Sequence, residues 1–373
     1  MGLGAVQIIV LALGVLSLGL SALAIRRDAP LVWEWAVPTL MQRAGIPEFK
    51  TVLDYTAETG IAHSPAIILN GKGASILWFA GSQEAQADVD VVGVDIAPDG
   101  TVTPITPRLT RGALGRAFEP RQLVVTLGNT VQNDGAESAL YTTAVSVGGW
   151  AMASIADVRM GPDGPLRARK LNLSPLLNRS FLVKSPMVGY ADGTYALPAY
   201  FEMGGTYGAL VRLDGQGRVR DMRRIQGRAH AIQPMIVPLD ARGAVALLRN
   251  FDSGGRRLLI SRTDDGGRSW DAVRETDIPN PSAPVAALGI GAGAILMVVN
   301  DDAGDGGILN LTVSEDSGET WRHLKTLEDG SAGDARYPMM RALPNGRILL
   351  VYSTRGKRGI RAHVFNLAWA LGA

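Results

Sequence analysis

Short apolar runs alternate with tight turns along most of the chain. The repeated unit is an apolar run, a turn that often contains Asp-Gly or Asn-Gly, a second apolar run that ends in polar residues, and a glycine-rich corner. Six copies occur, in chain order PAIILNGKGASILWFAG, QLVVTLGNTVQNDGAESALYTTAV, PMVGYADGTYALPAYFE, PMIVPLDARGAVALLRN, VAALGIGAGAILMVVN and PMMRALPNGRILLVYST. Two such runs, enriched in β-branched and aromatic residues and joined by a tight turn, predict a β-hairpin.

The spacing of the copies predicts how the hairpins assemble. Successive copies begin roughly 40 to 60 residues apart, which is the spacing of propeller blades with four strands each. No helical periodicity of useful length interrupts them after about Lys50, which argues against an α/β enzyme fold. We therefore predict an all-β fold, a six-bladed β-propeller over residues 51–368, preceded by one N-terminal hydrophobic helix.

The N-terminal residues follow a different pattern. No charged side chain occurs before Arg26, and an apolar stretch of this length can cross roughly 30 Å of hydrocarbon as a helix. Residues 1–27 are predicted to be an uncleaved membrane anchor, because the apolar run exceeds the usual length in a signal peptide; a secretory signal cleaved after Ala24 is the alternative. By the positive-inside rule alone, the arginines that end the run would stay in the cytoplasm. Residues 28–50 are predicted to be a linker, whose tryptophans fit either a membrane surface or packing against the main domain.

Composition narrows the classes of function. With 46% hydrophobic and 19% charged residues, the 373-residue chain is too apolar to be disordered and long enough to bury a large core. The formal net charge of +2 offers no polyanion-binding surface, so we expect no nucleic-acid partner. Cysteine is absent and the four histidines are scattered, so we expect no metal site and no cofactor.

Two octapeptides share one pattern, S/T-x-D-x-G-x-S/T-W. They are TDDGGRSW, which contains Asp265, and SEDSGETW, which contains Asp316. The pattern suits a hairpin corner, because the aspartate can accept backbone N–H bonds of the turn and the glycine can take a positive φ. The segments VDIAPDG near Asp99 and VRMGPDG near Asp163 look like eroded copies.

These octapeptides resemble the Asp-box, or BNR repeat. From about Thr51 to Phe365 the chain is similar to the BNR-repeat branch of the sialidase superfamily, through motifs that include HSPAI, WFAGSQEAQADVDVV, LGNTV, GGWAMAS, LVKSPM, LPAYFE, AIQPMIVPLD, LLRN, IPNPSA, VVND and RYPMM. The resemblance implies a sialidase-like propeller with a carbohydrate ligand, and it gives Asp265 and Asp316 structural roles at the outer rim. With the apolar N-terminus, it predicts a membrane-anchored domain outside the cytoplasm, periplasmic or at the cell surface, or alternatively a secreted one.

The resemblance also implies a set of site residues. Sialidases use a tyrosine nucleophile, and an aspartate as acid/base and three arginines that hold the substrate carboxylate complete the family's site. Tyr337, at the start of the last hairpin, corresponds to the nucleophile. Asp88 corresponds to the acid/base residue, with Glu84 and Asp90 as alternatives, and Arg249 corresponds to one arginine of the triad.

Three positions depart from the sialidase pattern. The sequence His-Ser-Pro from His63 stands where the first arginine is expected, and Gly-Asp-Gly-Gly over residues 304–307 stands where the third is expected. Gln233 replaces the glutamate that activates the tyrosine, and a glutamine cannot act as a base. His63 can donate to or pair with an anion. We therefore expect that recognition of a carboxylate by a full arginine triad is lost.

Further residues of the matched motifs are candidates for the same pocket, together with Gln233 and Glu84. They are Lys184, Tyr200, Glu202, Trp78, Asn129, Trp150, Asn280 and Asn300. Glu202 is the favoured replacement for the missing catalytic carboxylate, and Lys184 is expected to help hold the anionic group. The leading hypothesis is a sialidase-like glycoside hydrolase that acts on a sialic or other ulosonic acid of a glycan or surface polysaccharide. The alternative is a non-catalytic carbohydrate-binding or assembly propeller at the membrane.

Overall fold

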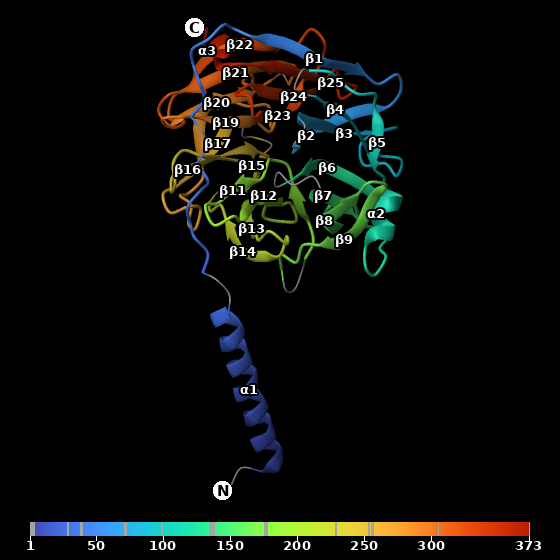
Figure 1. The fold of residues 1–373 in the computed structure, drawn as a ribbon, viewed down its shortest axis with the longest axis vertical. Coiled ribbons are helices and arrows are strands. Elements are labelled where there is room, and N and C mark those ends of the chain that lie inside the picture. The colour runs from blue at the N-terminus through green and yellow to red at the C-terminus, as the bar shows by residue number, and fades with distance from the viewer. Residues whose placement is uncertain are drawn as a thin grey trace. The chain divides into compact units, whose positions relative to one another are not determined.

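The chain forms two units, which are described separately. The computed structural model describes residues 4–27, 30–37, 40–70, 73–97, 100–133, 139–174, 178–227, 230–252, 254, 257–304 and 306–372. The first unit, Met1–Val32, contains helix α1 (Ala5–Arg27). Its segment Ala5–Leu23 has a mean hydropathy of 2.3, so α1 is long and apolar enough to cross a membrane. The hydrophobic N-terminal helix predicted from the sequence is confirmed (Figure 1).

The second unit, Trp33–Ala373, is built from six antiparallel sheets, here called blades I to VI. Blade I contains β2 (Ile61–Asn70), β3 (Gly73–Gly81), β4 (Asp90–Ile96) and β5 (Thr106–Leu109). Blade II contains β6 (Thr126–Gln132), β7 (Ala139–Val145), β8 (Ala153–Gly161) and β9 (Gly164–Lys170). Blade III contains β10 (Phe181–Val183), β11 (Val188–Gly189), β12 (Tyr195–Phe201), β13 (Tyr207–Leu213) and β14 (Val219–Arg224). In blade III, β10 and β11 both pair with β12.

The other three blades repeat the same order. Blade IV contains β15 (Ala231–Pro238), β16 (Ala244–Asn250), β17 (Arg257–Thr263) and β18 (Arg274–Pro279). Blade V contains β19 (Ala286–Gly291), β20 (Ala294–Val299), β21 (Ile308–Ser314) and β22 (Arg322–Asp329). Blade VI contains β23 (Arg336–Ala342), β24 (Ile348–Thr354), β25 (Gly359–Phe365) and β1 (Phe49–Thr56). Blade VI is therefore completed by the first strand of the propeller, which pairs with the last.

The blades follow one another around a closed ring. First strands of successive blades contact one another, as β15 contacts β19 and β19 contacts β23, and β23 contacts β2 to close the ring. In Figure 1 the colour runs once around this ring from blue to red. Five of the six predicted hairpins supply the first two strands of a blade, and the hairpin predicted in blade III supplies β11 and β12, so the predicted six-bladed propeller is confirmed.

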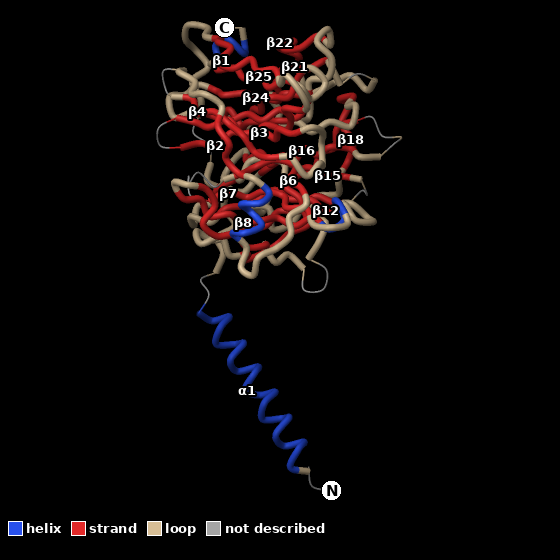
Figure 2. Tube along the Cα trace, turned by 90° about the vertical axis from the view of Figure 1, so that its right-hand side faces the viewer, coloured by secondary structure: helices blue, strands red, loops and turns tan. Residues whose placement is uncertain are grey.

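Burial explains why the inner strands have no alternating pattern. All eight residues of β15 are buried, whereas the outer strand β18 is mostly exposed or half-buried. A strand that is covered on both faces by neighbouring sheets is apolar throughout, while an outer strand alternates between the core and solvent. Helices in this unit are limited to α2 (Arg111–Ala117), a 3₁₀ turn (Gly149–Met152) and α3 (Leu367–Leu371), and Figure 2 shows strands and loops elsewhere in its described part.

Both intact octapeptides form hairpin corners, as predicted. The Asp265 carboxylate accepts hydrogen bonds from the Ser269 backbone N at 2.9 Å and from its hydroxyl at 2.6 Å. Asp316 accepts the same pair of bonds from Thr320. Trp270 is buried beside the first corner. Asp163 lies in the tight turn between β8 and β9, and Asp99 lies outside the described residues.

The N-terminal part of the second unit packs against the outside of the blades. Trp35 is 1% exposed and stacks on Tyr190 with ring centroids 4.4 Å apart. Its indole N–H donates to the Arg242 carbonyl at 3.3 Å. Farther along, Arg43 forms an ion pair of 3.1 Å with Glu315 in blade V. Of the two roles that fit the linker tryptophans, Trp35 therefore has the packing role.

Candidate functional site

The inner strands of four blades have a bulge near their first residues. It occurs in β2 between His63 and Ala66, in β6 between Gly128 and Val131, in β15 between Ile232 and Met235, and in β23 between Arg336 and Met339. In three of these bulges a residue followed by proline has a left-handed backbone, namely Ser64 (φ 55°), Gln233 (φ 53°) and Tyr337 (φ 57°). This conformation costs an L-residue roughly 1–2 kcal/mol. Bulges re-aim side chains, and backbone strain collects at functional sites.

Tyr337 is the centre of a cluster that draws on four blades. The His63 ring packs edge-on against the Tyr337 ring at 4.6 Å between centroids. The ammonium of Lys184 lies 5.9 Å from the centroid of the same ring. Arg249 donates from Nη1 to the Tyr337 phenol oxygen at 3.4 Å. Four residues that were predicted separately from blades I, III, IV and VI are thus brought together.

Arg249 extends the cluster toward blade III. The same Nη1 atom donates to Oε1 of Gln233 at 3.2 Å, and Nε2 of Gln233 donates to the Tyr200 hydroxyl at 3.2 Å. The Tyr200 side chain is fully buried, and burial raises the pKa of its phenol well above the ordinary value. Gln233 therefore joins a cation to a neutral phenol, and it adds no charge to the site.

Two buried nitrogen bases flank Tyr337. His63 is 3% exposed, neither ring nitrogen has a hydrogen-bond partner among the described residues, and burial lowers its pKa to about 3. Its imidazole is therefore neutral near pH 7. Lys184 is 2% exposed and donates to the Pro338 carbonyl at 3.1 Å. Burial lowers its pKa to about 7.

Two carboxylates are electrostatically coupled to this cluster. Burial raises the pKa of Glu202, and the nearby Arg249 charge opposes that shift. Partial burial acts to raise the pKa of Glu84, but the hydrogen bond from Lys357, with which it forms an ion pair of 2.5 Å, and the charges of Lys357 and Arg249 hold the pKa below the ordinary value. Glu84 also lines a small hollow with His63 and Trp150. Glu202 is thus the carboxylate that retains a proton more readily.

The other carboxylates of the predicted loop have local contacts. Asp88 is exposed, and its carboxylate accepts hydrogen bonds from the Ser82 backbone N at 3.0 Å and the Ser82 hydroxyl at 2.9 Å. Those bonds lower its pKa. Asp90 accepts a bond of 3.3 Å from the Arg111 backbone N. Within the described residues, neither carboxylate has a hydrogen bond or an ion pair with Tyr337 or Arg249, so Asp88 is not bonded to the cluster.

Three further candidates have roles in packing. Trp78 is fully buried in β3, where it packs against Tyr55 at 5.4 Å between ring centroids, so it is not exposed at the end of the ring that carries Tyr337, here called the mouth. Asn280 and Asn300 are fully buried amides. The Asn300 amide donates to the carbonyls of Gly306, Ile308 and Ala335, and the Asn280 amide donates to the Asn300 carbonyl. These two side chains order the loops between blades IV, V and VI.

The remaining candidates lie near blade II. Trp150 is half-buried in the 3₁₀ turn and covers Gly128, where a Cβ atom would lie 2.4 Å from the indole. It lines both the hollow beside His63 and a neighbouring cavity of about 250 Å³. Asn129 belongs to β6, and its side chain lies outside the described part of the chain. Trp150 is thus the described aromatic side chain at the edge of the cluster.

Comparison with known proteins agrees with this architecture. Residues 74–350 match the family described as the BNR repeat-like domain. The chain belongs to this family. A search of curated proteins finds no match.

Solved structures share the fold of this BNR repeat-like protein at low sequence identity. A Hadza microbial sialidase is 14% identical with a TM-score of 0.61, over 81% of this chain and 65% of that one. Trypanosoma rangeli sialidase, in complex with 2,3-difluorosialic acid as a covalent intermediate, is 11% identical with a TM-score of 0.60, over 84% and 55%. A protein of unknown function from Dyadobacter fermentans is 15% identical with a TM-score of 0.61, over 86% and 100%. The chain thus spans about two thirds or less of the length of these sialidases, and the likeness shows the fold.

One residue of the mouth was missed from the sequence. Arg336 directly precedes Tyr337, and its charge is among those that lower the pKa of His63. It donates from Nη1 to the Pro281 carbonyl at 3.3 Å and forms an ion pair of 3.1 Å with Asp334. The signal in the sequence is Arg-Tyr-Pro at the start of the last hairpin, although Arg336 does not lie at a position where the sialidase resemblance implies an arginine.

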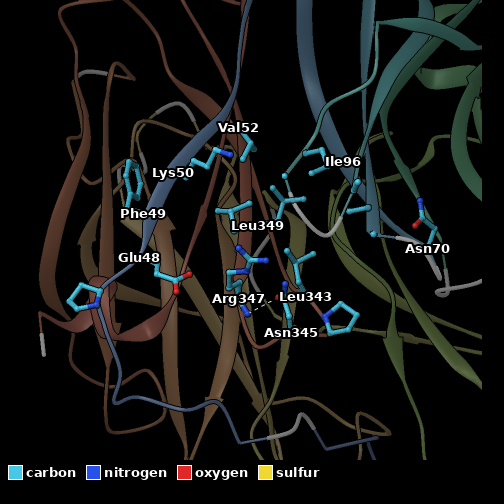
Figure 3. A pocket seen from close by; sticks show the side chains of 17 residues that line it. Glu48, Phe49, Lys50, Val52, Asn70, Ile96, Leu343, Asn345, Arg347 and Leu349 are labelled. Carbon is cyan, nitrogen blue, oxygen red and sulfur yellow. Dashed lines mark hydrogen bonds between the residues drawn. The ribbon is translucent and has the colours of Figure 1, made fainter.

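A larger cavity of the BNR repeat-like propeller lies elsewhere. It has a volume of about 480 Å³ and is lined by residues of β1, the β23–β24 turn and blade I, which include Lys50, Leu343 and Arg347 (Figure 3). The inner strands that contribute to it do so with their last residues, such as Asn70 of β2, whereas His63 and Tyr337 lie near the first residues of theirs. The cavity is therefore separate from the Tyr337 cluster.

Proposed function

We propose that this propeller is a sialidase-like glycoside hydrolase for an acidic sugar, a sialic or other ulosonic acid, of a glycan or surface polysaccharide. The observation that carries the proposal is the Tyr337 phenol, which is held by a left-handed bulge and hydrogen-bonded by Arg249 at 3.4 Å. Bulky residues seldom adopt this backbone conformation, and it is retained where the surrounding structure requires it.

Cations near Tyr337 support an anionic substrate. The positive charges of Lys357, Lys184 and Arg336 act on His63, and Arg249 contacts the phenol itself. A guanidinium binds a carboxylate through charge-assisted hydrogen bonds, which are stronger than bonds between neutral groups. Lys357 and Arg336 already pair with Glu84 and Asp334, whereas Arg249 forms no ion pair with the described residues, so a substrate carboxylate would supply its missing partner.

The proposed reaction proceeds in two displacements. The Tyr337 hydroxyl gives its proton to solvent water, because Gln233 cannot accept it, and its oxygen attacks the anomeric carbon. A tyrosyl–sugar bond forms, and the glycosidic C–O bond breaks as the leaving oxygen takes a proton from the donor carboxyl group. Water then attacks the same carbon and gives one proton to that carboxylate, the tyrosyl–sugar bond breaks, and the Tyr337 oxygen takes back a proton from solvent. Arg249 stabilises negative charge that develops on the phenol oxygen. Glu202, whose pKa is raised by burial, is proposed as the proton donor, and Asp88 is the alternative that the family resemblance implies.

Turnover of aryl glycosides tests this assignment. The full chain, purified in detergent, is assayed with a panel of aryl α-glycosides of sialic and ulosonic acids. Tyr337→Phe is expected to reduce kcat by at least about 10²-fold, the size of a typical contribution from one catalytic group. Tyr195→Phe is the matched control, since the Tyr195 hydroxyl has no hydrogen bond to the described residues. Turnover that survives Tyr337→Phe would exclude the proposed nucleophile, and no turnover of any glycoside would favour the non-catalytic binding propeller.

The proton donor can be identified from how the turnover of each variant depends on the leaving group of the substrate. A good phenol leaving group needs little protonation, whereas the alcohol of a natural linkage needs a full proton. Glu202→Gln is therefore expected to retain turnover of a nitrophenyl glycoside and lose turnover of an oligosaccharide. If Asp88→Asn shows this behaviour and Glu202→Gln does not, Asp88 is the donor.

We also propose that α1 anchors the propeller to a membrane, with the domain outside the cytoplasm. The support is the hydropathy of α1 and the location that a surface polysaccharide substrate requires. Alkaline carbonate extraction of membranes tests the anchor, since a peripheral protein is released and a spanning helix is not. Release of the chain, or an N-terminus that begins after Ala24, would favour the secreted alternative.

A further inference from the structure

The two arginines at the mouth flank one short segment, Pro281-Ser282, between blades IV and V. Arg249 donates from Nε to the Ser282 hydroxyl at 3.1 Å. Arg336 donates from Nη1 to the Pro281 carbonyl at 3.3 Å. Because consecutive residues accept these two bonds, guanidinium groups from blades IV and VI meet at one segment, and the one from blade IV also contacts Tyr337.

The position of Arg336 is fixed by a glycine in blade V. A Cβ atom at Gly306 would lie 2.0 Å from Nη2 and 2.3 Å from Cζ of Arg336. The guanidinium therefore occupies the space that a side chain at position 306 would need. This glycine belongs to the segment in which the sialidase resemblance leads one to expect an arginine.

The backbone around Arg336 is also held firmly. The Ala335 N donates to the Gly306 carbonyl at 3.0 Å. The Asn300 amide donates to the Gly306 carbonyl at 3.1 Å and to the Ala335 carbonyl at 2.8 Å. These bonds tie the loop of blade V to the residue that precedes Arg336, and the guanidinium itself is held by the Pro281 carbonyl and by Asp334.

Each guanidinium keeps one amino group without an acceptor. The Nη2 atoms of Arg249 and Arg336 make no hydrogen bond to the part of the chain that the structure describes, while their other nitrogens contact Ser282, Gln233, Pro281 and Asp334. An arginine satisfies a carboxylate best through two parallel N–H bonds or through paired donors. Arg249, which contacts the proposed nucleophile, and Arg336, which is bound to the same Pro281-Ser282 segment, thus each keep a donor for an anionic group; this pair of donors is here called the clamp.

We propose that Arg336, together with Arg249, binds the carboxylate of the substrate, and that Gly306 is required because it admits the Arg336 guanidinium. This inference rests on the proposed function and adds to it a residue that determines specificity. The clamp uses an arginine from blade VI in place of one from blade V. An acidic sugar is thereby preferred over its neutral ester.

Binding of paired ligands tests the clamp. Titration calorimetry on the full chain carrying Tyr337→Phe compares N-acetylneuraminic acid, 3-deoxy-octulosonic acid and glucuronic acid, each with its methyl ester. Arg336→Met is expected to weaken binding of the preferred acid by about 10- to 100-fold, which corresponds to the loss of one charge-assisted hydrogen bond of about 1.5–3 kcal/mol. Affinity for the ester is expected to change less than about 2-fold. Arg322→Met, an exposed arginine of β22, is the matched control.

A second variant tests the role of the glycine without removing a charge. Gly306→Ala is expected to weaken acid binding in the same direction as Arg336→Met, because the added methyl group displaces the guanidinium. Gly304→Ala is its control, since a Cβ there would approach Asp302 no closer than 3.4 Å. If the parent discriminates acid from ester and Arg336→Met does so equally, the clamp is refuted and the proposed function stands. If the parent binds no acid of the panel, both are refuted.

Discussion

Arg249 and Tyr337 are 88 positions apart in the chain, yet Nη1 of the arginine donates to the phenol oxygen at 3.4 Å. The same nitrogen atom donates to Gln233 Oε1 at 3.2 Å. The second oxygen that accepts a hydrogen bond from this Arg249 nitrogen is thus an amide oxygen, which carries no charge and accepts no proton near neutrality. The sialidase resemblance implies a glutamate at this position.

Gln233→Glu is expected to increase turnover. The substitution keeps an oxygen next to Arg249 and adds a carboxylate that can accept the tyrosine proton, and a positioned general base contributes on the order of 10²-fold or more. The rate should then fall below the pH at which the new carboxylate is protonated. Steady-state kcat over pH 4 to 9 gives the answer, with Gln233→Met as control. An unchanged kcat would mean that proton removal from Tyr337 does not limit the reaction.

Lys184→Met is expected to stabilise the protein at pH 7. The folded state lowers the pKa of Lys184 from 10.5 to about 7, so the unfolded chain binds more protons between these values. The native chain therefore gains stability as the pH rises from 7 toward 10.5, and the methionine variant lacks this gain. Urea unfolding at pH 7 and pH 9 measures the difference, with Lys50→Met as the exposed control. Equal pH dependence in both variants would contradict the prediction.

Tyr352→Phe is expected to weaken the attachment of β1 to β25, which completes blade VI. The buried Tyr352 hydroxyl bonds to Glu328 at 2.7 Å and to Nε2 of His363 at 2.9 Å, and Nδ1 of His363 bonds to Thr51 of β1 at 3.0 Å. Loss of a hydroxyl that satisfies buried partners costs about 1–3 kcal/mol. Thermal unfolding gives the size of the effect. A loss no greater than that of Tyr195→Phe would show that the network does not stabilise the closing strand.

Trp35→Ala is expected to loosen the segment that precedes β1. The indole is 1% exposed, stacks on Tyr190 and donates to a backbone carbonyl, so removal leaves a cavity and an unpaired acceptor. Truncation of a buried tryptophan costs about 3–5 kcal/mol. Limited proteolysis should show cleavage between residues 33 and 48 before the blades are cut. Trp33→Ala, at a half-buried position, should have a smaller effect; equal sensitivity of the two variants would contradict the anchoring role of Trp35.

Asp316→Asn is expected to lower stability without affecting the ligand. The carboxylate accepts bonds from Ser314, Glu319 and Thr320, which lower its pKa to about 2. Its contribution is therefore present above the ordinary pKa of 3.8 and is lost as the pH falls through about 2. Chemical unfolding at pH 7 should show a loss of about 1 kcal/mol relative to Asp264→Asn. A change in ligand affinity would argue against a purely structural corner.

Several features of the protein could be predicted from the sequence because they depend on local chemistry. Turn residues and β-branched runs define hairpins wherever they occur, and six of them at blade spacing leave few arrangements other than a ring. The corners at Asp265 and Asp316 are local hydrogen-bond networks, so eight residues suffice to specify each. Tyr337 could be found because the strand that follows it is recognisable.

The tertiary structure decided which side chains meet, because inner strands are buried on both faces and carry no periodicity that distinguishes mouth from core. Trp78 and Asn300 belong to matched motifs, but both side chains are fully buried, so their roles are in packing. Arg336 enters the cluster because a glycine 30 positions earlier in the chain leaves room for its guanidinium. Such a contact depends on the order of blades around the ring, which brings residues of blades V and VI together, and no local pattern in the sequence encodes it.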